Sequence, residues 1–436
     1  MSETKPSATG EREPMDLDRP ATAERPGVLA PSSGSIRLGS LDAMRGFVIA
    51  SMLLVNMTWD RESLPAQLFH VPWNDPVQGA TFADLVFPWF VFMAGAAAPL
   101  SMRSGRGRGK SSGQMLAAAA VRGAKLYLIG VVLTVASWAH ERPLAWDCLL
   151  SWNILQLLGV AYAAVVAAQL ASPRVRVALV VAVLALKAGT LLLPYDWVTS
   201  MATPRPAEGA PVGPGTWAHH DAVKQLLHME HVPVPSVASL LVGWVGMAQQ
   251  WLPLAAIGVI GALATESLLT DRSWRGVGRL AAVGAGLVAI GWLLQAGYRA
   301  EGGGGLGLLT MPYSKWLFTP SYCLLAAGTG VVLLAAFAAR IDTGRVGNAT
   351  ALKALGKNAL AVYVGAELSF KLVFARWLLP LPDSPGADSI AGATQAWLAH
   401  LTGSAALASL GWAAIWLAGW WWIAWRMDRR GVYVRV

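Results

Sequence analysis

Ten mostly apolar stretches recur along the chain, separated by short segments that carry most of its charges. Eight of them have roughly 18–25 residues, which is enough for a helix to cross a bilayer, and the sixth and tenth are longer. We therefore predict an all-α polytopic membrane protein with about ten transmembrane helices. The sixth stretch is long and is interrupted by Gln249, Gln250 and Pro253, which predicts a tilted or broken helix, or a re-entrant piece followed by a span. The predicted spans are 41–59, 82–102, 116–138, 151–171, 177–196, 235–264, 277–297, 317–339, 353–375 and 396–425.

The first 35 residues form a separate segment without any apolar run. They mix charges with Pro, Ser and Gly, a composition typical of a disordered tail. No apolar region follows a basic start, so we expect no signal peptide and a first span that inserts as its own signal. The predicted organisation is a disordered cytoplasmic tail over residues 1–35 and a ten-helix transmembrane domain over residues 36–436.

Composition strengthens the membrane assignment. Hydrophobic residues make up 55% of the chain and charged residues only 14%, values typical of an integral membrane protein rather than a soluble one. The net charge of +9 would suggest nucleic acid in a soluble protein, but here the basic residues lie between apolar spans, so we expect no nucleic-acid partner. Cys148 and Cys323 are far apart and offer neither metal-ligand spacing nor a disulfide framework.

The loops alternate in charge, and this alternation predicts the orientation of the spans. By the positive-inside rule the loops rich in Lys and Arg are cytoplasmic, both termini lie inside, and the loop after the first span is external. The high content of Ala, Gly and Arg indicates a GC-rich bacterial source, so we expect a multi-pass protein of the bacterial inner membrane. The basic set comprises Arg37, Arg103, Arg106, Arg108, Lys110, Arg174, Arg176, Arg272, Arg275, Arg340, Arg345 and the C-terminal tail from Arg426.

The external loop after the first span carries an unusual polar group. His70, Trp73, Asn74 and Asp75 lead directly into an apolar span that opens with Asp84. Polar groups at membrane depth are costly to hold and are usually retained for chemistry or transport. The loop therefore singles out His70 as a candidate reactive group.

Asn56 lies at the outer end of the first span, so we expect Asn56, His70 and Asp84 to converge at one site near the outer mouth of the bundle. Each also has a simpler structural interpretation. His70 suits an interfacial position facing solvent, Asp84 suits the N-terminal cap of the second span, and Asn56 suits a polar contact between helices. The residues alone leave both interpretations open.

Several motifs occur in a fixed order along residues 36–436. They are R-L-x-S-L-D-x-x-R-G, V-N, F-H-x-x-W-N and A-D-L-V-F-P-W-F-V-F-x-x-G, followed by Leu155-Gln156, Leu158-Gly159-Val160, Ser321-Tyr322 and GKNALAVYVG from Gly356 to Gly365. In this order the chain resembles the heparan-α-glucosaminide N-acetyltransferase family. The block over residues 70–95 is the specific one, and the later motifs gain weight from their order.

This resemblance implies acetyl transfer across a membrane. It makes residues 36–436 an acyltransferase domain, with cytosolic acetyl-CoA as donor and an amine outside, such as a terminal glucosamine, as acceptor. The family's reactive histidine falls on His70, a functional asparagine on Asn56, and the acid that starts its second span on Asp84. Related proteins also make a homodimer the expected assembly. The chain departs from the family where HVPVPS (231–236) replaces an acidic residue followed by Gly, and the external segment 197–233 is its own, so the acceptor stays open.

The three residues suit the chemistry that this transfer demands. A neutral imidazole at His70 can take the proton of the amine, or it can attack the thioester and carry the acetyl group as an acyl-imidazole. The amide of Asn56 can donate to the developing oxyanion, and Asp84 can accept the other ring N–H of His70. One sequence does not decide between base and acyl carrier.

The phosphates of a CoA thioester need cations at the inner helix ends. Arg45 and Arg122 are the first candidates and Arg103 and Lys125 the next, because guanidinium groups bind phosphate in a bidentate manner. The segment GRGRGKS is one residue short of a phosphate-binding loop and follows no strand, so we reject it as a nucleotide motif.

Two further groups of polar residues call for an interpretation. A metal site is not predicted at the external histidines, because Pro and Gly surround them and no fixed ligand geometry is evident. Lys187 and Glu367 lie within apolar spans, and Glu367 is expected to face the bundle interior. The histidines are His219, His220, His228 and His231.

Two rival functions remain open at the level of sequence. A secondary transporter of a small polar solute would show inverted repeats and broken helices that meet at the midplane, and no repeat is evident between the two halves. An O-acyltransferase acting on a hydroxyl of a glycan or lipid would need the same donor chemistry, and only a comparison of acceptors separates it from an N-acetyltransferase.

Overall fold

The computed structural model describes Met1 and residues 38–72, 79–138, 149, 153–191, 248–296, 311–343, 349–375, 378–380 and 387–434. Four features discussed above lie outside these ranges. They are the tail over residues 1–35, the Trp73-Asn74-Asp75 group, Cys148 and the external segment 197–233.

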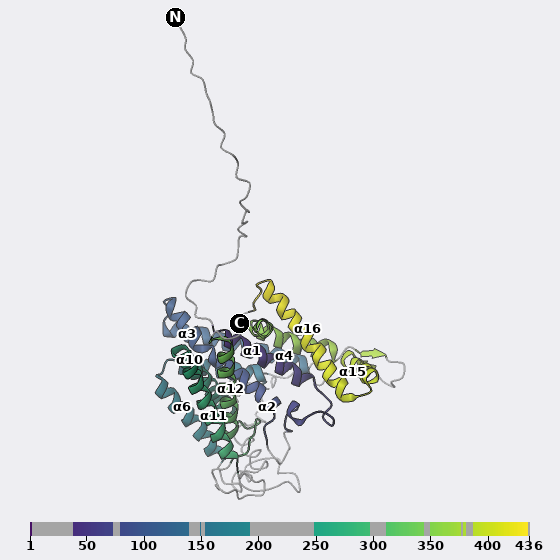
Figure 1. Ribbon diagram of the computed structural model, residues 1–436, viewed down its shortest axis with the longest axis horizontal. Coiled ribbons are helices and arrows are strands. Elements are labelled where there is room, and N and C mark those ends of the chain that lie inside the picture. The colour runs from purple at the N-terminus through teal and green to yellow at the C-terminus, as the bar shows by residue number, and fades with distance from the viewer. Residues whose placement is uncertain are drawn as a thin grey trace. The chain divides into compact units, whose positions relative to one another are not determined.

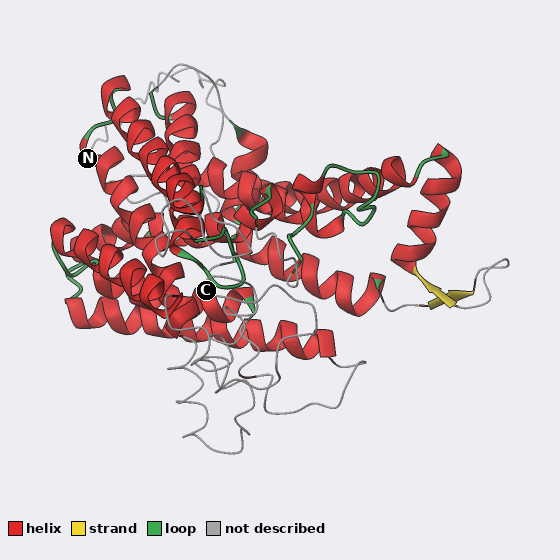
Figure 2. Ribbon diagram, turned by 90° about the horizontal axis from the view of Figure 1, so that it is seen from below, coloured by secondary structure: helices red, strands yellow, loops and turns green. Residues whose placement is uncertain are grey.

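The described residues are almost entirely helical (Figures 1 and 2). The first half contains α1 (Gly39–Met57), η1 (Ala66–Leu68), α2 (Phe82–Ala96), α3 (Ala98–Gly107), α4 (Ser112–Trp138), α5 (Ile154–Ala168) and α6 (Pro173–Leu191). The second half contains α10 (Ala248–Thr270), α11 (Trp274–Gln295), α12 (Pro320–Ile341), α13 (Thr350–Lys357), α14 (Ala359–Ser369), η4 (Phe370–Phe374), α15 (Ile390–Thr402) and α16 (Ala405–Arg429). Two short strands, β1 (Leu378–Pro380) and β2 (Ala387–Ser389), pair antiparallel between η4 and α15.

Seven helical stretches within the described residues are long and apolar enough to cross a membrane. The prediction of an all-α polytopic membrane protein is therefore confirmed, whereas the count of ten spans and the cytoplasmic placement of both termini stay predictions. The seven are α1, α2 with α3, α4, α10, α11, α12 and α16, and α5 is a shorter apolar helix.

Three predicted spans differ in detail from the structure. The ninth is not one helix, because it breaks at Asn358 into α13 and α14 and ends in a π-helical turn, η4. The tenth is divided at Gly403, which has a φ of 65° and separates α15 from α16. In the sixth, α10 includes Gln249, Gln250 and Pro253, so the helix does not break at these residues, and residues 235–247 of the predicted span lie outside the described ranges.

Burial divides the helices into central and peripheral ones. In α1, in α2 with α3, and in α10, 67% of the most apolar window is buried, against 28% in α4 and α16 and 22% in α11. Figure 1 shows α6, α10, α11 and α12 grouped on one side and α15 with α16 on the other. An apolar helix with a largely uncovered surface suits contact with lipid, and among the described helices α4, α11 and α16 have this character.

Glycine allows the closest helix contacts. A Cβ atom on Gly46 of α1 would overlap the carbonyl of Leu352 in α13, and one on Gly356 would overlap the carbonyl of Asp42. Gly95 of α2 faces the backbone of Gly258 in α10 in the same way. Small residues let helix backbones approach in membrane proteins, where packing rather than the hydrophobic effect drives association. These contacts fix α1 and α2, the two helices that flank the polar loop.

We predict that Gly46→Ala destabilises the folded protein by about 1–3 kcal/mol, because the added methyl group forces α13 away from α1. The measurement is the thermal unfolding midpoint of the purified protein in detergent. The matched control is Gly278→Ala in α11, where an added Cβ meets no atom within 4 Å and better helix propensity should maintain or raise stability. Equal midpoints for the two variants would contradict the close contact.

Candidate active site

The chain between α1 and α2 folds back so that His70 lies beside the first turn of α2. Thr81 caps α2, with its hydroxyl accepting from the Asp84 N–H at 3.3 Å while Oδ2 of Asp84 accepts from the Thr81 N–H at 3.1 Å. The Thr81 hydroxyl also donates to the carbonyl of Phe69 at 2.7 Å, and Gln67 Oε1 accepts from the Phe82 N–H at 2.8 Å. The helix start and the loop that carries His70 are therefore one hydrogen-bonded unit.

Asp84 is the centre of the site. Its Oδ1 lies 3.0 Å from Nδ1 of His70 and 3.0 Å from Nζ of Lys315, while its Oδ2 accepts from the Val71 N–H at 3.3 Å. The Asp84 side chain is 0% exposed, that of Lys315 15% and that of His70 45%. A buried carboxylate flanked by two basic groups thus supports a histidine whose ring reaches solvent. The predicted contact between His70 and Asp84 is confirmed.

Lys315 was not predicted from the sequence. It lies in the segment before α12, and its Nζ sits 4.4 Å from the centre of the Trp316 ring. Burial lowers the pKa of the Lys315 ammonium, an effect that the Asp84 carboxylate opposes and the charge of Arg61 reinforces. The available signal was a single lysine among Tyr313, Trp316 and Phe318, just before the predicted span over residues 317–339.

The segment that carries Lys315 is fixed to the rest of the site. Trp316 donates from Nε1 to the carbonyl of Val71 at 3.2 Å. Tyr322 of α12 donates its hydroxyl to the main-chain carbonyl of Asp84 at 2.6 Å. This hydrogen bond joins α12 to the start of α2. It gives Tyr322 of the Ser321-Tyr322 motif a structural role.

Asn56 has a different partner. At the end of α1 it donates from Nδ2 to Oε1 of Glu367 at 3.1 Å, and Glu367 also pairs with Lys371 at 3.2 Å. Among the described residues, its hydrogen bond therefore goes to α14 rather than to His70 or Asp84. Glu367 lies three residues before the start of the π-helical turn η4, a feature common at functional sites. Convergence of Asn56 with the other two residues stays a prediction.

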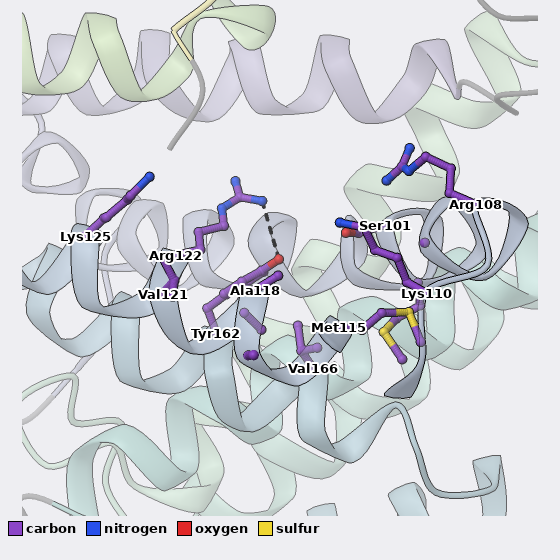
Figure 3. A pocket seen from close by; sticks show the side chains of 14 residues that line it. Ser101, Arg108, Lys110, Met115, Ala118, Val121, Arg122, Lys125, Tyr162 and Val166 are labelled. Atoms are coloured by element: carbon purple, nitrogen blue, oxygen red, sulfur yellow. Dashed lines mark hydrogen bonds between the residues drawn. The ribbon is translucent and has the colours of Figure 1, made fainter. Parts of the chain in front are cut away.

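A second polar site is a cavity of about 470 Å³ between α3, α4 and α5 (Figure 3). Arg122 donates to the Tyr162 hydroxyl at 3.4 Å, and its guanidinium lies 4.8 Å from the centre of the same ring. In Figure 3 the basic ends of Arg108, Arg122 and Lys125 extend to the same side. Four basic residues line the cavity: Arg108, Lys110, Arg122 and Lys125.

The structure separates the four predicted cofactor contacts. Arg122 and Lys125 line the cavity, whereas Arg103 is exposed on α3 and is not among the described residues that line it. Arg45 pairs with Asp42 at 3.3 Å and lies 3.4 Å from the carbonyl of Gly356. Asp42 and Arg45 are three residues apart and thus share one face of α1.

The two sites lie at opposite ends of the same pair of helices. Asp84 is in the first turn of α2, and the cavity begins at Ser101 in α3. The stretch Phe82–Gly107 has 26 residues, which at about 1.5 Å per residue is roughly 39 Å when straight. A bilayer has a hydrocarbon core of about 30 Å, so the α2–α3 pair is long enough to place the His70 site and the cationic cavity near opposite faces of a membrane.

Two other sets of polar residues lie outside both sites. Within the described ranges, no group of three His, Cys, Asp or Glu residues has the arrangement of a metal site, and the external histidines lie outside those ranges. Lys187 is buried in α6 and donates to Oε1 of Gln249 at 3.3 Å. This bond links α6 to α10.

Comparison with known proteins identifies the family that this arrangement resembles. Residues 37–203 match the family model described as heparan-α-glucosaminide N-acetyltransferase, catalytic. The heparan-α-glucosaminide N-acetyltransferase of Homo sapiens is 36% identical over 150 residues, which are 34% of this chain and 21% of that protein. The Mus musculus protein of the same name is 37% identical over 130 residues, 30% of this chain and 19% of that protein.

The chain thus spans about a fifth of the length of these curated relatives. The predicted family resemblance is confirmed. The family match includes His70, Asp84 and Arg122, whereas Lys315 and Glu367 lie beyond it.

We predict that Thr81→Ala lowers stability by about 1 kcal/mol, because it removes the side chain that caps α2 and anchors Phe69. The matched control is Ser273→Ala, which removes the side-chain cap of α11 far from His70. Both variants should lose a similar amount in thermal unfolding, but only Thr81→Ala should make the 59–81 loop more susceptible to limited proteolysis. Equal susceptibility in both variants would contradict the role of Thr81 in holding the loop.

Proposed function

We propose, from the relationship of this chain to the heparan-α-glucosaminide N-acetyltransferase family, that it is a transmembrane acetyltransferase. It takes the acetyl group from cytosolic acetyl-CoA and delivers it to an amine, such as that of a terminal glucosamine, at the outer face. One observation carries the proposal. The stretch that matches the family's catalytic model holds a buried carboxylate paired with a histidine at one end and a cationic cavity at the other.

His70 is the proposed reacting group. When its Nδ1–H donates to Asp84, the lone pair on Nε2 is left for chemistry. As a base, His70 takes the proton of the amine while the amine nitrogen attacks the thioester carbon. The C–S bond then breaks, and the proton passes from Nε2 to the CoA thiolate. This route forms the amide in one transfer.

His70 also suits the role of acyl carrier. In that route Nε2 attacks the thioester carbon, the C–S bond breaks, and CoA thiolate leaves an acetyl group on the ring. The amine then attacks the same carbon, the C–Nε2 bond breaks, and the amine proton neutralises the thiolate. Both routes need the same orientation of His70 by Asp84.

Asn56 is the proposed donor to the oxyanion of either route. Its amide has two N–H groups, and one of them goes to Glu367. That bond fixes the direction of the amide and leaves the second N–H for a carbonyl oxygen that gains charge. Glu367 is thus proposed to orient Asn56, much as Asp84 orients His70.

The cationic cavity is the proposed site for the CoA phosphates. Arg108, Lys110, Arg122 and Lys125 supply positive charge, and Tyr162 holds the Arg122 guanidinium by its ring and hydroxyl. The thioester end of the cofactor would extend from there into the bundle toward His70. Arg45 and Arg103 remain proposed as further inner-face contacts.

The cellular setting is part of the same proposal. We place the chain in a bacterial inner membrane with both termini cytoplasmic, so that the cavity opens to cytosolic acetyl-CoA and His70 faces the acceptor. A homodimer is the assembly proposed from the family.

We predict that purified protein releases CoA from acetyl-CoA when glucosamine is present, and that His70→Ala lowers this rate about 10²- to 10⁴-fold by removing the general base or carrier. The measurement is thiol release with a colorimetric reagent. The matched control is His400→Ala, an exposed histidine of α15, which should retain wild-type turnover.

Parallel reactions with a hydroxyl acceptor distinguish an O-acyltransferase from an N-acetyltransferase. If neither acceptor supports turnover and acetyl-CoA does not bind, the acetyltransferase proposal fails and a transporter becomes the better explanation. An acetyl group trapped on His70 in the absence of acceptor would assign the acyl-carrier route.

We predict that Arg122→Gln raises the KM for acetyl-CoA about tenfold with little change in kcat, because one charged contact to phosphate is lost. Steady-state kinetics with varied acetyl-CoA make the measurement. Arg275→Gln, at an exposed arginine of α11, removes the same charge elsewhere and should leave KM unchanged. Equal KM values for the two variants would place the phosphates outside the cavity.

A further inference from the structure

The carboxylate that orients His70 is shared. Oδ1 of Asp84 is 3.0 Å from Nδ1 of His70 and 3.0 Å from Nζ of Lys315, so one oxygen atom serves both basic groups. Lys315 comes from a segment far along the chain that lies beyond the family match. We propose that Lys315 is a positioning residue that neutralises Asp84 and thereby keeps His70 in its neutral, reactive form. This proposal rests on the proposed function only in taking His70 as the reacting group.

The physical argument begins with the buried carboxylate. An isolated anion within about 4–6 Å of an imidazole favours the charged imidazolium and shifts its titration upward by roughly 1–3 pH units. A protonated His70 has no lone pair on Nε2 and performs neither proposed step. The ammonium of Lys315 offsets the charge of Asp84 at the same oxygen, so loss of the ammonium should strengthen the attraction of the carboxylate for a second proton on the ring.

The other charged groups around His70 are few. Among the described residues, Arg61 of the same loop donates to the His70 carbonyl at 3.1 Å and adds positive charge, α2 contributes Asp84, and the segment before α12 contributes Lys315. Asp84 is therefore the single acidic side chain in contact with the His70 ring within the described part of the chain. Neutralisation of Asp84 by Lys315 therefore sets the net negative charge beside the His70 imidazole.

The segment around Lys315 is built to hold this position. Thr319 Oγ1 donates to the carbonyl of Pro312 at 2.7 Å and accepts from the Ser314 N–H at 3.2 Å, which closes the turn that presents Lys315. Phe318 adopts a φ of 49°, a left-handed conformation that is strained for a bulky residue. Such strain persists only where surrounding contacts determine it, and it clusters at functional sites.

The test measures the charge state of His70 directly. Diethyl pyrocarbonate modifies neutral imidazole, and His70 is exposed enough to react. The rate of its modification, followed by peptide mass spectrometry from pH 5.5 to 9, gives a titration midpoint without any turnover. His400 in the same samples is an internal control that no variant should change. The probe is independent of acetyl transfer, so a failed acetyltransferase assay and a failed role for Lys315 are distinguishable.

Four variants separate charge balance from simple structural support. Lys315→Met leaves Asp84 without its ammonium and should raise the midpoint by one pH unit or more. Asp84→Asn leaves the charge of Lys315 beside the ring and should lower the midpoint. The double variant Asp84→Asn with Lys315→Met removes both charges and should return the midpoint to near the wild-type value. Lys315→Arg keeps the charge and should keep the midpoint.

In kinetics, Lys315→Met should move the acidic limb of the pH–kcat/KM profile upward by the same amount, and Lys315→Arg should not. Equal midpoints in the wild type and Lys315→Met would overturn the proposal. If Lys315→Met does not fold, the proposal is tested by comparing the midpoints of Asp84→Asn and the double variant. A lower midpoint in Asp84→Asn than in the double variant supports a charge effect of Lys315, and equal midpoints in these two overturn it.

Discussion

The pairing of the buried Asp84 carboxylate is the interaction on which the rest of the site depends. A carboxylate with no solvent contact must be matched by donors, and Asp84 obtains them from the 58–72 loop, from the cap of α2 and from Lys315. Each donor fixes a different segment, so the charge of one side chain sets the relative positions of His70, α2 and the segment before α12. Removal of one partner from such a group is costly because the remaining charge stays buried.

The second organising feature is the length of the α2–α3 pair. It is long enough to cross a bilayer, and one run of residues carries Asp84 at one end and the basic segment of the cavity at the other. Glycine contacts hold this pair against α10 and hold α1 against α13, so the central helices pack with their backbones in close contact. Under the proposed function, an acetyl group would pass from the cavity end of this pair to the His70 end.

Local patterns predicted much of this arrangement. Apolar runs located most helices, and the proximity of His70 and Asp84 followed from their positions in the loop after the first span and at the start of the second. Lys315 was missed because its partner lies in a distant segment, and spacing along a chain carries no information about such pairs. The breaks at Asn358 and Gly403 were missed because hydropathy records length but not backbone conformation. Asn56 was singled out correctly as a polar side chain, yet its bond to Glu367 depends on how α1 and α14 pack.

Asp84 and Lys315 are synthesised at different times, and this delay has a consequence for biogenesis. Lys315 follows Asp84 by 231 residues, so at about 5–20 residues per second it leaves the ribosome roughly 10–50 s later. If the first helices enter the membrane within that interval, Asp84 still lacks the Lys315 ammonium. His70, only 14 residues away, is then its local partner. His70 would thus be the sole basic partner of Asp84 early in translation. Lys315 would join the pair only after the C-terminal half is synthesised, and this step would complete the site.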